Sequence, residues 1–198
     1  MSGTTHMAVG AAITVTIVQP KNIQESMIAL ACGVIGGIAP DVDTENATMA
    51  RIIRSILAFI ASALIILYKC RNYIDDIHIQ KTVQWLFEGI GIDNIFYCLL
   101  FFTLLMIGSF TKHRNVTHSI EFIACQTVVL YFIHPMLALP FVLSALSHTA
   151  LDILNRKKVK ISLLINKSLS FGICKSNGII DRLFLVSSMI YIFIRASL

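Results

Sequence analysis

Polar connectors divide the chain into apolar runs of uneven length. These runs cover residues 7–18, 27–39, 52–68, 95–110, 120–133, 136–146 and 183–194. Only the third and fourth approach the ~20 residues that span a bilayer, and several others would cover about half to two-thirds of it. The pattern predicts an all-α fold, a polytopic membrane bundle of about six to seven short transmembrane or half-buried helices, in which some helices shield others from lipid. We expect residues 1–198 to form a single membrane-embedded domain.

Two local features predict how these helices pack. Ala29, Gly33 and Gly37 recur every four residues in the second run, and such a face of small side chains lets helices approach closely. We therefore expect this helix to be central. Pro135 follows His134 in the middle of the stretch 120–146, and a proline cannot continue a helix without losing a hydrogen bond. The stretch should split there into two antiparallel halves.

Composition supports the membrane assignment. Hydrophobic residues make up 56% of the 198 residues, charged residues make up 14%, and the mean hydropathy is +0.78, whereas soluble domains contain about 25% charged residues. The first residues lack the basic region and cleavage site of a signal peptide, so we expect the N-terminus to be retained. The cysteines show no C-x-x-C spacing, which argues against a disulfide framework or a thiolate zinc site.

The charged residues predict an orientation. If each run crosses the membrane once, the connectors alternate between two sides. The side that holds the N-terminus then collects most of the lysines and arginines, namely Arg51, Arg54, Lys112, Arg114, Arg156, Lys157, Lys158, Lys160, Lys167, Lys175 and Arg182. By the positive-inside bias this side should be cytoplasmic. Tyr73 and the C-terminus should then lie outside.

Metal-capable residues, which were not used to assign the sides, fall mostly on this cytoplasmic side, whereas His78 and His134 fall on the other. The seven on the cytoplasmic side are His6, Asp41, Asp43, His113, His118, His148 and Asp152. Imidazole and carboxylate ligands together suit zinc, manganese or iron better than calcium, and seven ligands exceed what one ion normally needs. The pattern predicts a divalent metal, zinc or manganese, with room for two ions.

Spacing constrains how these residues can share an ion. Asp41 and Asp43 would point the same way if the chain is extended after Pro40. His148 and Asp152 would share one helical face because they are four residues apart. His113 and His118 are five apart and could face one ion only if the first lies in a turn and the second in the first helical turn.

The motifs that contain these residues carry a family resemblance. They are His6, Pro40-Asp41-Val42-Asp43, His113-Arg114-x-x-Thr117-His118-Ser119 and Ser147-His148-x-x-x-Asp152. In this order, over nearly the whole chain, they resemble the bacterial family of LexA-regulated, membrane-bound metal-dependent hydrolases. The resemblance implies an inner-membrane helical protein with a hydrolase-type metal centre, and it implies that the same seven residues are the ligands. The chain departs from the family pattern at Asn115, after Asp152, and at Asp181, which stands in place of a glutamate.

Metal-assisted hydrolysis of an ester or phosphoester is the chemistry expected of such a site. We expect Arg114 to contribute to catalysis by holding an anionic small-molecule or lipid substrate, although it could equally be a snorkelling surface cation. Glu121 is a candidate general base or second-shell acceptor, with stabilisation of a helix N-terminus as its alternative role. The basic cluster at 156–160 would either attract the anion or only set topology. Thr117 and Ser119 fit helix caps better than nucleophiles.

Two other functions stay open at this point. The His/Asp cluster could be a transport or sensing site for a divalent metal, although few polar residues lie in the opposite halves of the helices. Alternatively, it could hold a structural metal with a closed ligand shell in a non-catalytic membrane protein. The only partners that we expect are membrane lipid and an anionic substrate, with no nucleic acid, and the oligomeric state is left open.

Overall fold

The computed structural model describes residues 1–44, 55, 58, 62, 92–165 and 167–197. The third apolar run, 52–68, therefore lies almost entirely outside the described residues, as do Tyr73 and the other residues of 63–91. Within the described ranges the chain is overwhelmingly helical, and the only strands there are two residues long. The prediction of an all-α bundle is confirmed.

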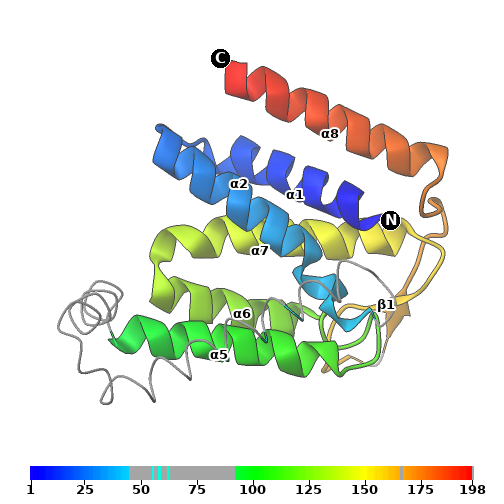
Figure 1. Cartoon of the computed structure of the whole chain (residues 1–198). Coiled ribbons are helices and arrows are strands. Elements are labelled where there is room, and N and C mark those ends of the chain that lie inside the picture. Colours follow the sequence, from blue (N-terminus) through cyan, green and yellow to red (C-terminus); the bar gives the residue numbers. More distant parts are fainter. Residues whose placement is uncertain (45–54, 56–57, 59–61, 63–91, 166, 198) are drawn as a thin grey trace.

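The structure contains six α-helices in these ranges (Figure 1). They are α1 (Gly3–Val18), α2 (Ile23–Ile38), α5 (Ile92–Ser109), α6 (Ile120–Ile133), α7 (Pro135–Leu154) and α8 (Ile179–Ser197). A 3-10 helix, η1 (Ala39–Asp43), continues α2, and β1 (Val159–Lys160) pairs antiparallel with β2 (Ser168–Leu169) between α7 and α8. The stretch Ile23–Asp43 and helix α7 are each long and apolar enough to cross a membrane, while α1, α6 and most of α5 are shorter apolar helices.

The break between α6 and α7 falls where the sequence predicted it. Helix α6 ends at Ile133, and Pro135 opens α7 at a position where its missing N–H would have no helical partner. The side chain of His134 accepts a hydrogen bond from the backbone N–H of Met136 at 3.3 Å and so caps the new helix. The two helices then run antiparallel along each other (Figure 1).

Small residues allow the central helices to pack closely. Helix α2 lies between α1 and α7, as predicted for a central helix. A Cβ atom on Gly33 would lie 2.7 Å from the Cα of Ala11, and one on Gly37 would lie 2.5 Å from the carbonyl oxygen of His6. No side chain fits at these distances, so glycine sets the separation of α1 and α2.

Helix ends converge at one end of the bundle. The start of α1, the end of α2 with η1, the end of α7 and the start of α8 all lie near the N-terminus in Figure 1. Next to this end and extending away from it, η1, α5, α6 and α7 enclose an apolar core that includes Phe101, Leu105, Ile123, Leu130 and Phe141. The polar end is where the predicted ligands come together.

Candidate metal centre

Helix η1 delivers the two aspartates. From the sequence, the two would point the same way if the chain were extended after Pro40, and this condition is not met, because Ala39–Asp43 continue helically from α2. Pro40 is tolerated there because it stands in the first turn, where its missing N–H costs nothing. In a 3-10 helix, residues two apart point about 120° away from each other rather than in one direction. Asp41 and Asp43 consequently face different partners.

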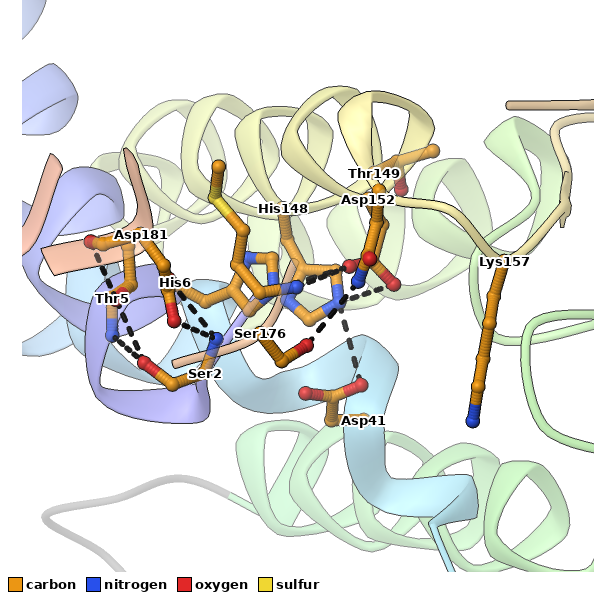
Figure 2. A network of polar contacts seen from close by, with 12 residues as sticks. Ser2, Thr5, His6, Asp41, His148, Thr149, Asp152, Lys157, Ser176 and Asp181 are labelled. Atoms are coloured by element: carbon orange, nitrogen blue, oxygen red, sulfur yellow. Dashed lines mark hydrogen bonds and ion pairs between the residues drawn. The ribbon is translucent and has the colours of Figure 1, made fainter. Parts of the chain in front are cut away.

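Helix α7 supplies His148 and Asp152 from one face, as their spacing predicted. His148 is fully buried, and its Nδ1 lies 2.7 Å from the carbonyl oxygen of Gly37. A carbonyl can only accept, so Nδ1 carries the proton and donates it. Nε2 of His148 is therefore directed into the site, next to Asp41 (Figure 2).

The connector between α5 and α6 supplies His113, Arg114 and His118. Arg114 takes a left-handed backbone conformation, with φ of 64°, and its backbone N–H donates to Asp43 Oδ2 at 3.1 Å. His118 is fully buried immediately before the cap of α6, which is Ser119, as predicted. Burial, as the largest influence, holds the pKa of His118 below its ordinary value of 6.5. Its imidazole is thus neutral and able to bind a metal.

Thr117 fixes the orientation of that imidazole. Its hydroxyl donates to Asp43 Oδ2 at 2.5 Å, and its Oγ1 lies 3.0 Å from Nδ1 of His118. Because the hydroxyl proton is already used, Oγ1 accepts from a protonated Nδ1. Nε2 of His118 is then also an unprotonated acceptor, and it faces Nε2 of His148 at 3.2 Å.

Four side chains thus form a first ligand group whose ligand atoms all lie within 4.8 Å of one another: Asp41, His118, His148 and Asp152. Oδ1 of Asp41 lies 3.8 Å from His118 Nε2 and 3.5 Å from His148 Nε2. Oδ2 of Asp152 lies 3.5 Å and 4.0 Å from the same two nitrogens. The carboxylate oxygens only accept, and the two Nε2 atoms, 3.2 Å apart, need a proton or a cation between them. A cation is what such a set of lone pairs accommodates.

A second ligand group shares Asp41 with the first and adds Asp43 and His113. It is more open, since the side chain of His113 is 34% exposed. Its members already satisfy one another, because His113 Nδ1 lies 2.7 Å from Asp43 Oδ1 and Arg114 Nε donates to His113 Nε2 at 3.3 Å. His113 and His118 therefore belong to different groups. To share one ion, His118 would have to lie in the first turn of a helix, whereas it precedes α6, which begins at Ile120.

Positive groups surround Asp152. Arg114 Nη2 lies 2.8 Å from Oδ2, and the Met1 amine lies 3.0 Å from Oδ1. His6 stacks on His148 with ring centroids 3.7 Å apart, and its Nε2 is 3.3 Å from Asp152 Oδ1. Figure 2 shows His6, His148 and Asp152 side by side. His6 lies outside both ligand groups, so its predicted role as a ligand stays a prediction.

Glu121 and Asp181, which were also singled out from the sequence, lie outside both ligand groups. The carboxylate of Glu121 accepts from the Ser162 hydroxyl and, at 3.0 Å, from the Leu163 backbone N–H. Its catalytic role likewise stays a prediction. Asp181 is buried at the start of α8 and accepts from the backbone N–H groups of Ser2 and Asn177 at 3.1 and 2.7 Å. It joins the beginnings of α1 and α8 beside the site (Figure 2).

Sequence reasoning missed the groups that orient the two imidazoles. Thr117 was interpreted as a cap, whereas its hydroxyl joins Asp43 to His118. The position of Thr117 immediately before His118, a candidate ligand, is the feature of the sequence that could have indicated this role. The Gly37 carbonyl could not be identified, because any residue has one and only the packing of α2 against α7 brings it to His148.

The comparisons with known proteins give one result. No curated protein and no solved structure was found to match the chain. The family described as YdjM inner membrane protein matches residues 1–196, which is nearly the whole sequence. That description agrees with the apolar helices and with the two stretches long enough to span a membrane. The chain belongs to the YdjM inner membrane protein family.

Proposed function

We propose that this protein is a metal-dependent hydrolase whose substrate is an anionic ester or phosphoester. The observation that carries the proposal is the first ligand group, in which two histidine nitrogens and two carboxylate oxygens converge. Buried away from water, these nitrogen and oxygen atoms would repel one another unless a cation or additional protons lay between them. The resemblance seen in the sequence, with the LexA-controlled expression that it implies, points to the same class of protein.

The residues present fit a divalent metal such as zinc or manganese. His118, His148, Asp41 and Asp152 would hold it, and Gly37 and Thr117 keep the two imidazoles in the required tautomer. A bound dication would lower the pKa of a water molecule and polarise the ester or phosphoryl oxygen. Asp43 and His113, which share Asp41 with the first group, are the side chains available for a second ion.

Arg114 is the residue best placed to hold the anion. Its guanidinium lies beside Asp152, and the arginine side chain is 10% exposed. A guanidinium presents a planar fork that matches a carboxylate or phosphate. Because Nη1 also donates to the carbonyl oxygen of Lys157 at 2.9 Å, the guanidinium is held next to the ligand group rather than free to leave it.

Two observations favour an enzyme over the alternatives. Asp41 is 27% exposed, so the first group is not a closed structural shell. For transport, the ion would need a polar path onward, whereas the side chains next to the site between α5, α6 and α7 form the apolar core described above. We further propose that the protein crosses the membrane several times and that the site faces the cytoplasm, in line with the bias of its basic residues.

Metal content tests the ligand group. Purified protein should contain stoichiometric zinc or manganese by elemental analysis, and His148→Ala should lose most of it, because loss of a direct ligand weakens binding severely. His134→Ala is the matched control, since it removes a histidine at the opposite end of α7. Equal metal content in both variants would remove the basis of the proposal.

Turnover tests the chemistry. A panel of phosphomonoesters, phosphodiesters and phospholipids in detergent should include at least one substrate of the wild-type protein. Asp41→Asn should reduce that turnover by orders of magnitude, because it keeps the size of the side chain and removes the charge that the metal requires. Chelation should abolish the activity reversibly. A fully metal-loaded protein that hydrolyses no member of the panel, or activity insensitive to chelator, would contradict the proposed reaction.

A further inference from the structure

The segment 156–175 joins α7 to α8 and carries β1 and β2; we call it the basic hairpin. It has no acidic residue, and its basic residues are Arg156, Lys157, Lys158, Lys160, Lys167 and Lys175. Among these, only Lys160 is half-buried and the others are exposed. The segment therefore presents a strongly positive surface beside the candidate metal centre.

Large apolar side chains of the basic hairpin are also exposed. The exposed fraction is 88% for Leu164 and 68% for Phe171. Leu163, Ile165, Leu169 and Ile173 are exposed as well. Their concentration within a loop of mixed basic and apolar character is typical of a surface that meets a partner rather than water.

This exposure is built into the fold, because the backbone of the hairpin is held in place. Its own buried residues, Val159 and Cys174, are almost completely inaccessible. On one side, the carbonyl oxygen of Ile161 accepts from the N–H of Ile120 at 2.8 Å. On the other, the N–H of Phe171 donates to the carbonyl oxygen of Ile153 at 2.7 Å. The apolar side chains are thus displayed on a fixed scaffold.

The position of the hairpin identifies the partner. Helix α7 has 20 residues and is about 30 Å long, which matches the hydrocarbon core of a bilayer. The hairpin starts directly after α7 ends at Leu154, so it begins at the membrane surface. Basic side chains there attract anionic lipid head groups, and Leu and Phe enter the boundary between head groups and acyl chains.

We infer that the basic hairpin docks on an anionic lipid leaflet, inserting the side chains around Leu164 and Phe171 while its lysines contact the head groups. The inference extends to the metal centre through one contact. The carbonyl oxygen of Lys157 accepts from Arg114, whose other nitrogen contacts Asp152. Docking of the hairpin would therefore hold Arg114, and with it Asp152, close to the level of the lipid head groups. The inference does not depend on hydrolysis, and its test uses neither metal content nor turnover.

A tryptophan probe tests the insertion in the full-length protein. Trp85 is the only tryptophan, so Trp85→Phe gives a silent background into which Leu164→Trp is introduced. Position 164 is so exposed that the replacement disturbs no packing. In nanodiscs containing phosphatidylglycerol, the emission of this probe should shift to shorter wavelength, and brominated lipid should quench it. In phosphatidylcholine alone, both effects should be weaker.

Matched variants separate insertion from other causes. Lys112→Trp places the same probe on an exposed polar position of the neighbouring connector, where bromolipid should quench it little. Lys157→Gln with Lys158→Gln should remove the dependence of the Leu164→Trp signal on phosphatidylglycerol. A probe at 164 that remains fully accessible to acrylamide in anionic nanodiscs would overturn the inference. An emission shift that depends on protein concentration would also overturn it, because it would indicate contact with a second copy of the chain. An emission shift produced by RNA in the absence of lipid would overturn it as well.

Discussion

Proton positions decide what the converging histidines can hold. His148 is committed by the Gly37 carbonyl to protonation at Nδ1, and His118 is committed by Thr117, whose own proton goes to Asp43. The two Nε2 atoms consequently face the site and lie only 3.2 Å apart. The orienting partners, one a backbone carbonyl and one a hydroxyl, therefore matter as much as the ligands. Without them each imidazole could turn its protonated nitrogen into the site.

Thr117→Val tests this orientation at the scale of one hydroxyl. The variant keeps the shape of the side chain but removes one donor from Asp43 and the acceptor of His118 Nδ1. Loss of such an orienting contact should lower zinc affinity by about 10- to 100-fold, measured by calorimetric titration in detergent. Thr117→Ser keeps the hydroxyl and should retain most of the affinity. Wild-type affinity in Thr117→Val would mean that the tautomer of His118 is fixed by something else.

At the scale of helices, the sequence predicted several boundaries, and two of its largest errors lie at the site. The apolar run 120–133 coincides with α6. In contrast, α7 continues to Leu154 although its apolar run stops at 146, because buried polar residues such as His148 and Asp152 replace the hydrophobic signal. Helix α1 begins at Gly3 rather than near Met7 for the same reason.

The sequence could predict the membership of the site but not its internal arrangement. Residue types and the side of the membrane placed the His and Asp residues together. Their division into two groups depends on the 3-10 turn of η1, which turns Asp41 and Asp43 apart. That turn follows from the continuation of α2 and from tertiary hydrogen bonds to Asp43, made by Arg114 and Thr117 from a distant connector. Such contacts leave no periodic signal in the sequence.

Gly33→Ala tests the close approach of α1 and α2. The added Cβ would lie 2.5 Å from Thr14 Oγ1 and 2.7 Å from the Cα of Ala11, so the helices would have to separate. Such overpacking costs about 1–3 kcal/mol, and thermal unfolding in detergent should occur at a lower temperature. Gly3→Ala is the control, because nothing lies within 4 Å of its added Cβ. Equal unfolding temperatures for the two variants would contradict close packing at Gly33.

For the molecule as a whole, the large apolar side chains on the outside are as informative as the core. Phe96, Ile107, Val128, Tyr131 and Leu139 are each more than half exposed, and they come from three different helices. Each Å² of apolar surface in water costs about 25 cal/mol, whereas lipid removes that cost. Meanwhile, the His and Asp residues of the candidate metal centre are gathered at one end of the bundle. This distribution fits a protein whose helices are surrounded by lipid.

Topology mapping tests that arrangement and the sidedness of the site together. Reporter fusions after Lys157 should be cytoplasmic, whereas fusions after His134 and after the C-terminus should be external, because in the proposed topology α7 and α8 each carry the chain across once. The fusion after Lys157 reports the side of the metal centre, since the carbonyl of Lys157 contacts Arg114. If the fusions after His134 and after Lys157 were found on the same side, α7 would not cross the membrane. The metal centre and the basic hairpin would then lose their shared position at the cytoplasmic surface.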